Sequence, residues 1–99
     1  MKHLTIGRRI SEYMSKSNNA RLRLKAYKCF IDLVESDKKD FAEVWRNRAS
    51  SPRKLKERQR FLTSLRVQSA RRQEKLGKAA VELLWLLEGT AKKSPEHQE

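Results

Sequence analysis

Apolar residues recur at helical spacing along almost the whole chain. Residues 4–16, 20–35 and 37–49 each carry an apolar stripe, and polar breaks at Ser17-Asn18-Asn19 and Ser36-Asp37 separate them. The middle segment carries two stripes rather than one, which is typical of a helix that is buried over much of its girth. No stretch alternates apolar and polar residues as a half-buried strand would. The pattern therefore predicts an all-α protein with its second helix at the centre of the core.

The helical pattern then continues from Pro52 to Glu88, and only Gly77 interrupts it. Ser51-Pro52 marks its start, since proline is favoured at the first helical position, and Gly89 marks its end. Gly77 is the one internal breaker, so this segment is either a single rod or two helices divided at that glycine. We predict a small helical bundle of three short helices plus one long C-terminal helix. Residues 1–89 would form a single domain and residues 90–99 a flexible polar tail.

Leucines recur every seven residues along the predicted long helix, at Leu55, Leu62, Leu76 and Leu83, with Ser69 at the missing position. We expect this seam to pack on the other helices of the same chain. The alternative is a homodimer formed through the long helix as a coiled coil. The longest apolar run, residues 79–87, contains Glu82 and falls short of the ~20 residues that a transmembrane helix needs.

Charge narrows the possible functions. The 99 residues include 24 Lys and Arg against 12 Asp and Glu, which gives a formal net charge of +12. Such a charge destabilises a compact state through self-repulsion, so we expect an anionic partner: nucleic acid, an acidic protein or an acidic membrane surface. Residues 52–78 alone hold ten basic and two acidic residues. An ordinary surface helix would intersperse Glu with Lys, and this imbalance favours a binding face over a solvated one.

On a continuous helix most of these basic residues would lie opposite the leucines, as a ridge about 39 Å long. Arg46 and Arg48, at the end of the third helix, would extend it. Eight of the twelve arginines lie between residues 46 and 72, and the guanidinium fork suits phosphate better than an ammonium does. The candidate nucleic-acid-binding residues are Arg46, Arg48, Arg53, Lys54, Lys56, Arg60, Arg71, Arg72, Lys75 and Lys78.

The expected function is that of a small basic nucleic-acid-binding protein, either regulatory or part of a ribonucleoprotein. Few aromatic residues lie among the basic ones, so we expect phosphate contacts to duplex DNA or structured RNA rather than base stacking. Neither DNA nor RNA is favoured. A helix-turn-helix over residues 20–49 is disfavoured, because Asp37, Asp40 and Glu43 would face phosphates.

The alternative is an adaptor or inhibitor that docks its basic amphipathic helix on an acidic protein. Residues 79–87 are apolar on nearly all sides, so this segment is either deeply buried or an interface. Its candidate protein-interface residues are Leu83, Leu84, Trp85 and Leu87. Arg58 falls near the leucine seam, where we expect it to pair with Asp40 or Glu43.

Catalytic and metal chemistry are not expected from this sequence. His3 and His97 lie at opposite ends and Cys29 is the single cysteine, so no zinc-ligand spacing and no disulfide within the chain can be assembled. The three glycines are isolated and form no phosphate-binding loop. We therefore expect no enzyme activity, cofactor or small-molecule substrate. Residues 1–16 do not resemble a secretory signal, which favours a cytoplasmic location, or a nuclear one in a eukaryote or virus.

Overall fold

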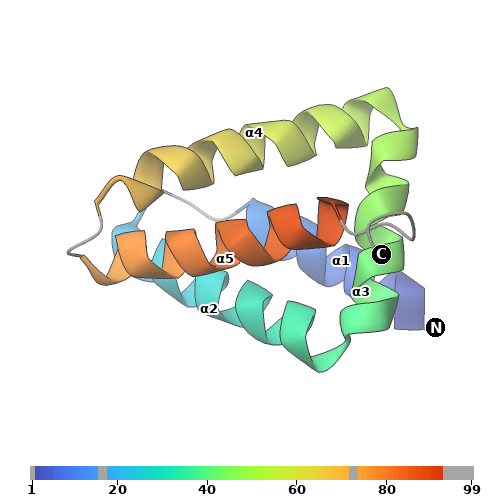
Figure 1. The fold of residues 1–99 in the computed structure, drawn as a ribbon, viewed down its shortest axis with the longest axis horizontal. Helices are drawn as coiled ribbons and strands as arrows, with labels where there is room; N and C mark the ends of the chain where they lie inside the picture. Colours follow the sequence, from blue (N-terminus) through green and yellow to red (C-terminus); the bar gives the residue numbers. More distant parts are fainter. Residues whose placement is uncertain (1, 16–17, 72–73, 93–99) are drawn as a thin grey trace, which may run out of the picture.

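The computed structural model describes residues 2–15, 18–71 and 74–92, and these ranges are helical apart from the connecting turns (Figure 1). They contain no strand, so the predicted all-α class is confirmed. The elements in chain order are α1 (Lys2–Met14), α2 (Ala20–Ser36), α3 (Lys38–Asn47), the single-turn 3₁₀ helix η1 (Arg48–Ser50), α4 (Pro52–Ser69) and α5 (Lys75–Lys92).

The helices α2, α3 and α4 start where the sequence predicts them, whereas α1 starts at Lys2 rather than at Leu4. Asn19 caps α2, and its side-chain Oδ1 accepts hydrogen bonds from the backbone N–H of Arg21 (2.8 Å) and of Leu22 (3.2 Å). Asp37 separates α2 from α3, although it forms no side-chain cap hydrogen bond at the start of α3. Pro52 occupies the first position of α4.

The predicted long C-terminal helix is wrong. The chain turns back between α4 and α5, over residues 70–74, and the two helices lie side by side as a hairpin (Figure 1). Gly77 does not divide them, because it lies inside the first turn of α5. Gly89 also lies within α5, which continues to Lys92, so the predicted tail begins too early. Residues 93–99 of that tail lie outside the described ranges.

Burial explains why the hairpin replaces the rod. Leu65 of α4 and Leu76 and Leu83 of α5 are all buried in one core. A straight helix would carry one of its halves away from the core, whereas a hairpin brings both halves onto the same core. The expectation that the leucines pack within their own chain agrees with this arrangement. The alternative of a homodimer stays a prediction, although one continuous helix is not there to form it.

Helix α2 supplies six buried residues to the core, but α5 rather than α2 lies in the middle of the fold, so the predicted central position of α2 is wrong (Figure 1). Phe30 is fully buried, and its ring centroid lies 5.9 Å from that of Phe41, 6.1 Å from Trp45 and 5.5 Å from Phe61. This aromatic cluster joins α2, α3 and α4, with α5 packed between α2 and α4 (Figure 1). None of the described helices is long and apolar enough to cross a membrane.

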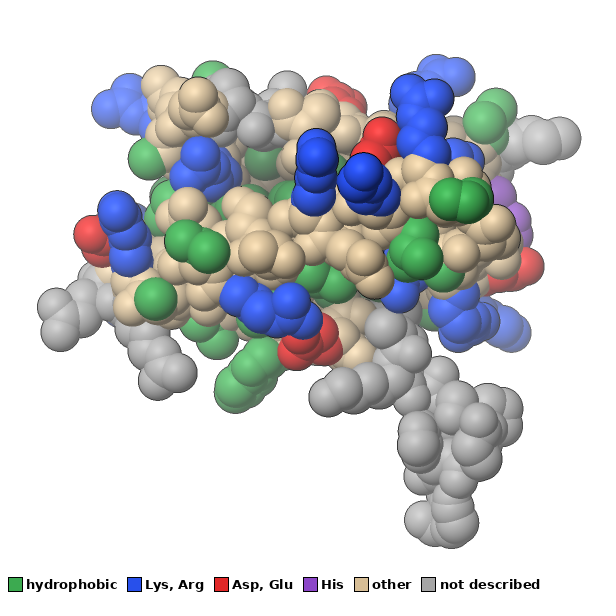
Figure 2. Space-filling model, turned by 90° about the horizontal axis from the view of Figure 1, so that it is seen from above, with side chains coloured by type: hydrophobic (Ala, Val, Ile, Leu, Met, Phe, Trp, Pro, Cys, Tyr) green, Lys and Arg blue, Asp and Glu red, His purple; other side chains and the backbone are tan. Residues whose placement is uncertain are grey.

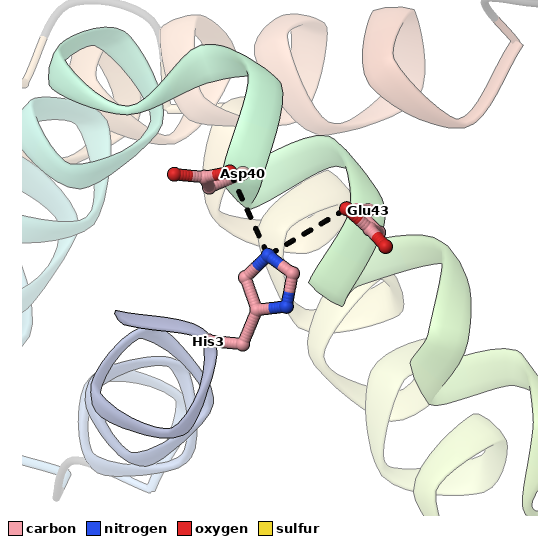
Figure 3. Close-up of side chains that lie close together, drawn as sticks. All are labelled: His3, Asp40 and Glu43. Atoms are coloured by element: carbon pink, nitrogen blue, oxygen red, sulfur yellow. Dashed lines mark ion pairs between the residues drawn. The ribbon is translucent and has the colours of Figure 1, made fainter. Parts of the chain in front are cut away.

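Polar contacts fasten the outer helices. His3 Nε2 of α1 lies 3.6 Å from Asp40 Oδ1 and 3.5 Å from Glu43 Oε1 of α3 (Figure 3). The prediction that Arg58 pairs with Asp40 or Glu43 is wrong. Arg58 Nη1 instead donates to the Trp45 carbonyl oxygen (2.7 Å), and the Arg58 guanidinium lies 5.0 Å from the centre of the Trp45 ring. The aromatic face and the carbonyl both attract the cation, which explains its place beside the core.

Candidate nucleic-acid interface

The outer face of α4 retains part of the predicted basic ridge. Arg53, Lys56 and Arg60 are spaced by three and four residues, so they share one face of the helix, and all three are exposed. The Arg53 side chain is 87% exposed. Lys54 is also exposed, beside this row. Figure 2 looks onto the side of the molecule that α4 forms, where Lys and Arg side chains are more numerous than carboxylates.

The rest of the ridge is displaced by the hairpin. Arg71, Lys75 and Lys78 are exposed, but they lie around the α4–α5 turn and the start of α5 rather than in line with the α4 row. Arg71 Nη1 lies 3.7 Å from Glu74 Oε1. Arg72 lies outside the described residues. The single 39 Å ridge is therefore wrong, since it assumed one continuous helix.

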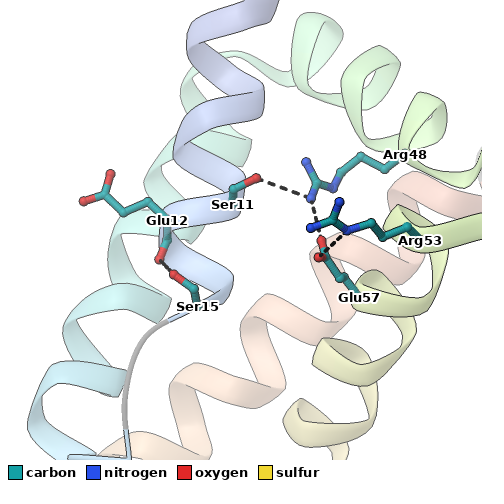
Figure 4. Close-up of polar contacts among 6 residues, drawn as sticks. All are labelled: Ser11, Glu12, Ser15, Arg48, Arg53 and Glu57. Atoms are coloured by element: carbon teal, nitrogen blue, oxygen red, sulfur yellow. Dashed lines mark hydrogen bonds and ion pairs between the residues drawn. The ribbon is translucent and has the colours of Figure 1, made fainter. Parts of the chain in front are cut away.

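Arg48 does not belong to the exposed surface. It is 6% exposed in η1, where its Nη2 lies 3.4 Å from Ser11 Oγ of α1 and 3.6 Å from Glu57 Oε1 of α4 (Figure 4). Burial lowers the pKa of Arg48, and the nearby Glu57 carboxylate opposes that effect. Arg48 thus links three elements at their junction and is not placed to contact phosphate. Arg46, by contrast, stays exposed on α3.

A cleft of about 800 Å³ opens between α1, the start of α2, and α4. Arginines from all three helices line it: Arg8 from α1, Arg23 from α2 and Arg60 from α4. The remaining lining residues are Ser11, Glu12, Tyr13, Met14, Ser15, Asn18, Tyr27, Glu57, Phe61 and Ser64. Tyr27 and Phe61 are largely buried, so they close the cleft on its core side.

A second hollow of about 470 Å³ shares Asn18 and Arg23 with this cleft. It adds Arg21 from α2 and Arg71 from the α4–α5 turn. Because they share two lining residues, the two hollows adjoin each other, and we call them together the α2/α4 groove. It is lined by five arginines: Arg8, Arg21, Arg23, Arg60 and Arg71.

Three acids, Glu12, Glu57 and Glu74, line the groove beside its five arginines, and Glu57 and Glu74 are engaged in ion pairs. Glu57 lies 3.6 Å from Arg48 Nη2 and 4.0 Å from Arg53 Nε (Figure 4), and Glu74 faces Arg71. Within residues 2–15, 18–71 and 74–92, Arg8, Arg21, Arg23 and Arg60 form no ion pair with a carboxylate. Four arginines in one groove thus retain their capacity to bind an external anion.

Sequence reasoning missed Arg8, Arg21 and Arg23. Residues 1–36 carry eight basic and three acidic residues, which was the available signal. Their spacing did not single out these three, because Arg8 lies on α1, Arg21 and Arg23 lie on α2, and they meet Arg60 of α4 only after the chain has folded.

Two phenol groups, those of Tyr27 and Tyr13, also line the cleft. Burial raises the pKa of the Tyr27 phenol above its ordinary value of 10.0, against the opposing effects of Arg23 and of a hydrogen bond with Ser64. Burial likewise raises the pKa of Tyr13, whose ring is half-buried against Phe30. Both phenols stay neutral at pH 7, so the cleft keeps its excess of positive charge.

The predicted protein interface on α5 is reduced to one residue. Leu83, Leu84 and Leu87 are buried in the core, because α5 packs between α2 and α4. Their assignment to an interface is therefore wrong. Trp85 points the other way and is 73% exposed.

His3, Asp40 and Glu43 form the cluster that could hold a metal ion among the described residues, since one ligand atom of each lies within 4.8 Å of the others (Figure 3). Sequence reasoning set His3 aside as a terminal residue and did not anticipate this meeting of α1 and α3. All three side chains are accessible to solvent, and the ion pairs they form when His3 is protonated already account for the arrangement.

The α2/α4 groove and the α4 face are thus the two places where exposed arginines gather. Comparisons of this chain with protein-family models, with curated proteins and with solved structures find no match.

Proposed function

We propose that this chain is a small nucleic-acid-binding protein that grips phosphates with arginines and lysines of α4 and of the neighbouring α2/α4 groove. The observation that carries the proposal is the meeting of Arg8, Arg23 and Arg60, from three helices, at one cleft. Like charges placed together destabilise a fold unless an anion neutralises them. A polyanion meets that requirement along the whole groove and the adjoining α4 face.

The residues proposed for contact are those that the solvent can reach. Those predicted from the sequence are Arg53, Lys54, Lys56, Arg60, Arg71, Lys75 and Lys78, and all of them are exposed. The groove adds Arg8 and Arg21, which are exposed, and Arg23, which is half-buried. Arg46 is exposed, but it lines neither hollow. Arginine suits this task because its guanidinium can bind two phosphate oxygens at once.

Binding to nucleic acid at several salt concentrations tests the proposal. Phosphate contacts release counterions, so log affinity is expected to fall linearly with log salt, with a slope of about one per contact. The charge-reversal pair Lys56→Glu and Arg60→Glu is expected to weaken binding at least about tenfold for any sequence. A chain that binds no DNA or RNA at low salt would contradict the proposal.

The matched control reverses two charges elsewhere. Lys38 and Lys39 are exposed on the first turn of α3 and line neither hollow. Lys38→Glu with Lys39→Glu changes the net charge by the same amount, and its effect measures the contribution of overall charge alone. If the two double variants lose affinity equally, the α4 face is not the binding site.

A second candidate function, docking on an acidic protein, is favoured by Trp85. An exposed tryptophan is a common centre of protein interfaces, and this one adjoins Glu88, which pairs with Arg66 at 2.9 Å. Polyglutamate separates the two functions. If it binds as tightly as nucleic acid of equal charge, and Trp85→Ala weakens that binding, the protein-docking function is preferred.

A further inference from the structure

The α2/α4 groove is concave, and its shape bears on which form of nucleic acid it accepts. Its arginines reach it from different sides: Arg8 and Arg23 from α1 and α2, and Arg60 from α4. A ligand must therefore enter between helices to meet all three. The phosphates of a duplex lie on a broad convex cylinder, so a duplex can reach the rim of such a recess but cannot fill it.

The size of the recess also favours a ligand smaller than a duplex. The cleft of about 800 Å³ is in the range of small-ligand sites, which hold molecules of nucleotide size. The second hollow of about 470 Å³ continues from it past Asn18 and Arg23 towards Arg71. A recess of this size can take an unpaired nucleotide, whereas a duplex, which is wider, can meet only its rim.

The cleft also offers neutral polar groups, which can bind phosphates and can equally bind the edges of unpaired bases. Ser11, Ser64 and Asn18 supply hydroxyl and amide groups beside the arginines, and Tyr13 supplies a half-buried aromatic ring. Hydroxyl and amide groups can bond the Watson–Crick edges of bases, which are accessible when bases are unpaired. Sites for single strands combine a basic groove with aromatic rings on which bases stack. The sequence has few aromatic residues to offer, and Tyr13 is the one partly exposed ring that lines this cleft.

We infer that the α2/α4 groove binds an unpaired segment of a nucleic-acid strand, with Arg8, Arg23 and Arg60 on its phosphates. This inference rests on the proposed function and makes it specific. Base contacts come from Ser11, Asn18, Ser64 and Tyr13, while Arg21 and Arg71 hold the neighbouring phosphates. The exposed α4 face then serves the flanking regions of the same molecule, as in a structured RNA with a loop.

The test compares a short unpaired oligonucleotide of mixed sequence with a blunt duplex of the same sequence, by fluorescence anisotropy at one salt concentration. The wild-type chain is expected to bind the unpaired probe more tightly. Arg8→Gln with Arg23→Gln is expected to weaken binding of the unpaired probe at least about tenfold and to affect the duplex much less.

The control variant is Lys25→Gln with Lys28→Gln. Both lysines are exposed on α2 and line neither hollow, and the variant loses the same two charges. It is expected to keep the preference for the unpaired probe. Circular dichroism checks that both double variants remain helical, and Arg60→Gln is the further groove variant if Arg23→Gln disturbs folding.

Three results overturn the inference, and they differ in what they say of the proposed function. Duplex binding that is as tight as binding of the unpaired probe, or equal losses in the groove and control variants, removes the inference and leaves nucleic-acid binding intact. Failure of the wild-type chain to bind either probe removes both.

Discussion

Gly77 of α5 lies against the backbone carbonyl of Arg71, so closely that a Cβ at residue 77 would overlap it. The same Cβ would lie 3.1 Å from the carbonyl oxygen of Gln68. The start of α5 thus packs directly on the end of α4, and only glycine permits that approach. We expect Gly77→Ala to lower the free energy of unfolding by about 1–3 kcal/mol, because the backbone must shift to admit the methyl group. Urea denaturation measures the change.

Gly89 provides the control for Gly77. A Cβ added at Gly89 meets nothing within 4 Å, and the residue lies inside α5. Gly89→Ala is therefore expected to raise the free energy of unfolding, by up to about 1 kcal/mol, through helix propensity alone. Equal stabilisation by both substitutions would mean that residue 77 is not crowded and that the hairpin is packed differently.

The helix starts of this fold were predictable because their signals are local. Asn19 and Pro52 act within one turn of their own helices. The α4–α5 turn has no such signal, since residues 70–74 contain neither glycine nor proline. The chain reverses there because the leucines on both sides share one core. Gly77, which the sequence suggested as a breaker, serves close packing instead.

The candidate site was predictable only in part, for a related reason. Exposure of Arg53 and Lys56 follows from their place on a helix opposite its apolar face. The burial of Arg48 depends on Ser11 and Glu57, which belong to other elements. The α2/α4 groove likewise exists only once three helices have met, and no pattern within one helix encodes it.

Arg48 is expected to be a structural residue. Its guanidinium joins Ser11 of α1 to Glu57 of α4 while almost entirely buried. Arg48→Met keeps much of the side-chain volume but removes these contacts, and we expect it to cost about 1–3 kcal/mol of stability. Arg46→Met, at an exposed position on α3, is expected to stay within about 0.5 kcal/mol of wild type. Equal effects of the two substitutions in chemical denaturation would show that the junction does not depend on Arg48.

Tyr27 is expected to make stability fall at alkaline pH. Burial raises the pKa of its phenol in the folded chain above the ordinary value of 10.0, so the unfolded chain loses this proton first. The contribution of Tyr27 to stability is therefore complete below the ordinary phenol pKa of 10.0. It is lost as pH rises from there through the raised pKa of the folded chain. Tyr27→Phe removes this dependence, although it also removes the hydrogen bond with Ser64, at a cost of about 1 kcal/mol near neutral pH.

Urea denaturation of both proteins, near neutral pH and again above the ordinary phenol pKa, measures the effect of Tyr27. The difference in stability between wild type and Tyr27→Phe should shrink as pH rises, since the titrations of the other groups are common to both chains. A difference that stays constant with pH would mean that Tyr27 ionises equally easily in the folded and unfolded states.

The two tryptophans should report opposite environments. Trp45 is 0% exposed within the aromatic cluster, whereas Trp85 is 73% exposed on α5. We expect acrylamide to quench much of the wild-type fluorescence, and Trp85→Phe to leave a blue-shifted emission that resists quenching. Acrylamide is uncharged, so the high positive charge of the protein does not bias its approach.

A second copy or a partner that covered α5 would shield Trp85. Quenching that weakens as protein concentration rises, together with a doubled mass in light scattering, would therefore assign this face of α5 to a dimer. Quenching that is independent of concentration leaves Trp85 on a free surface, as the fold of the single chain requires.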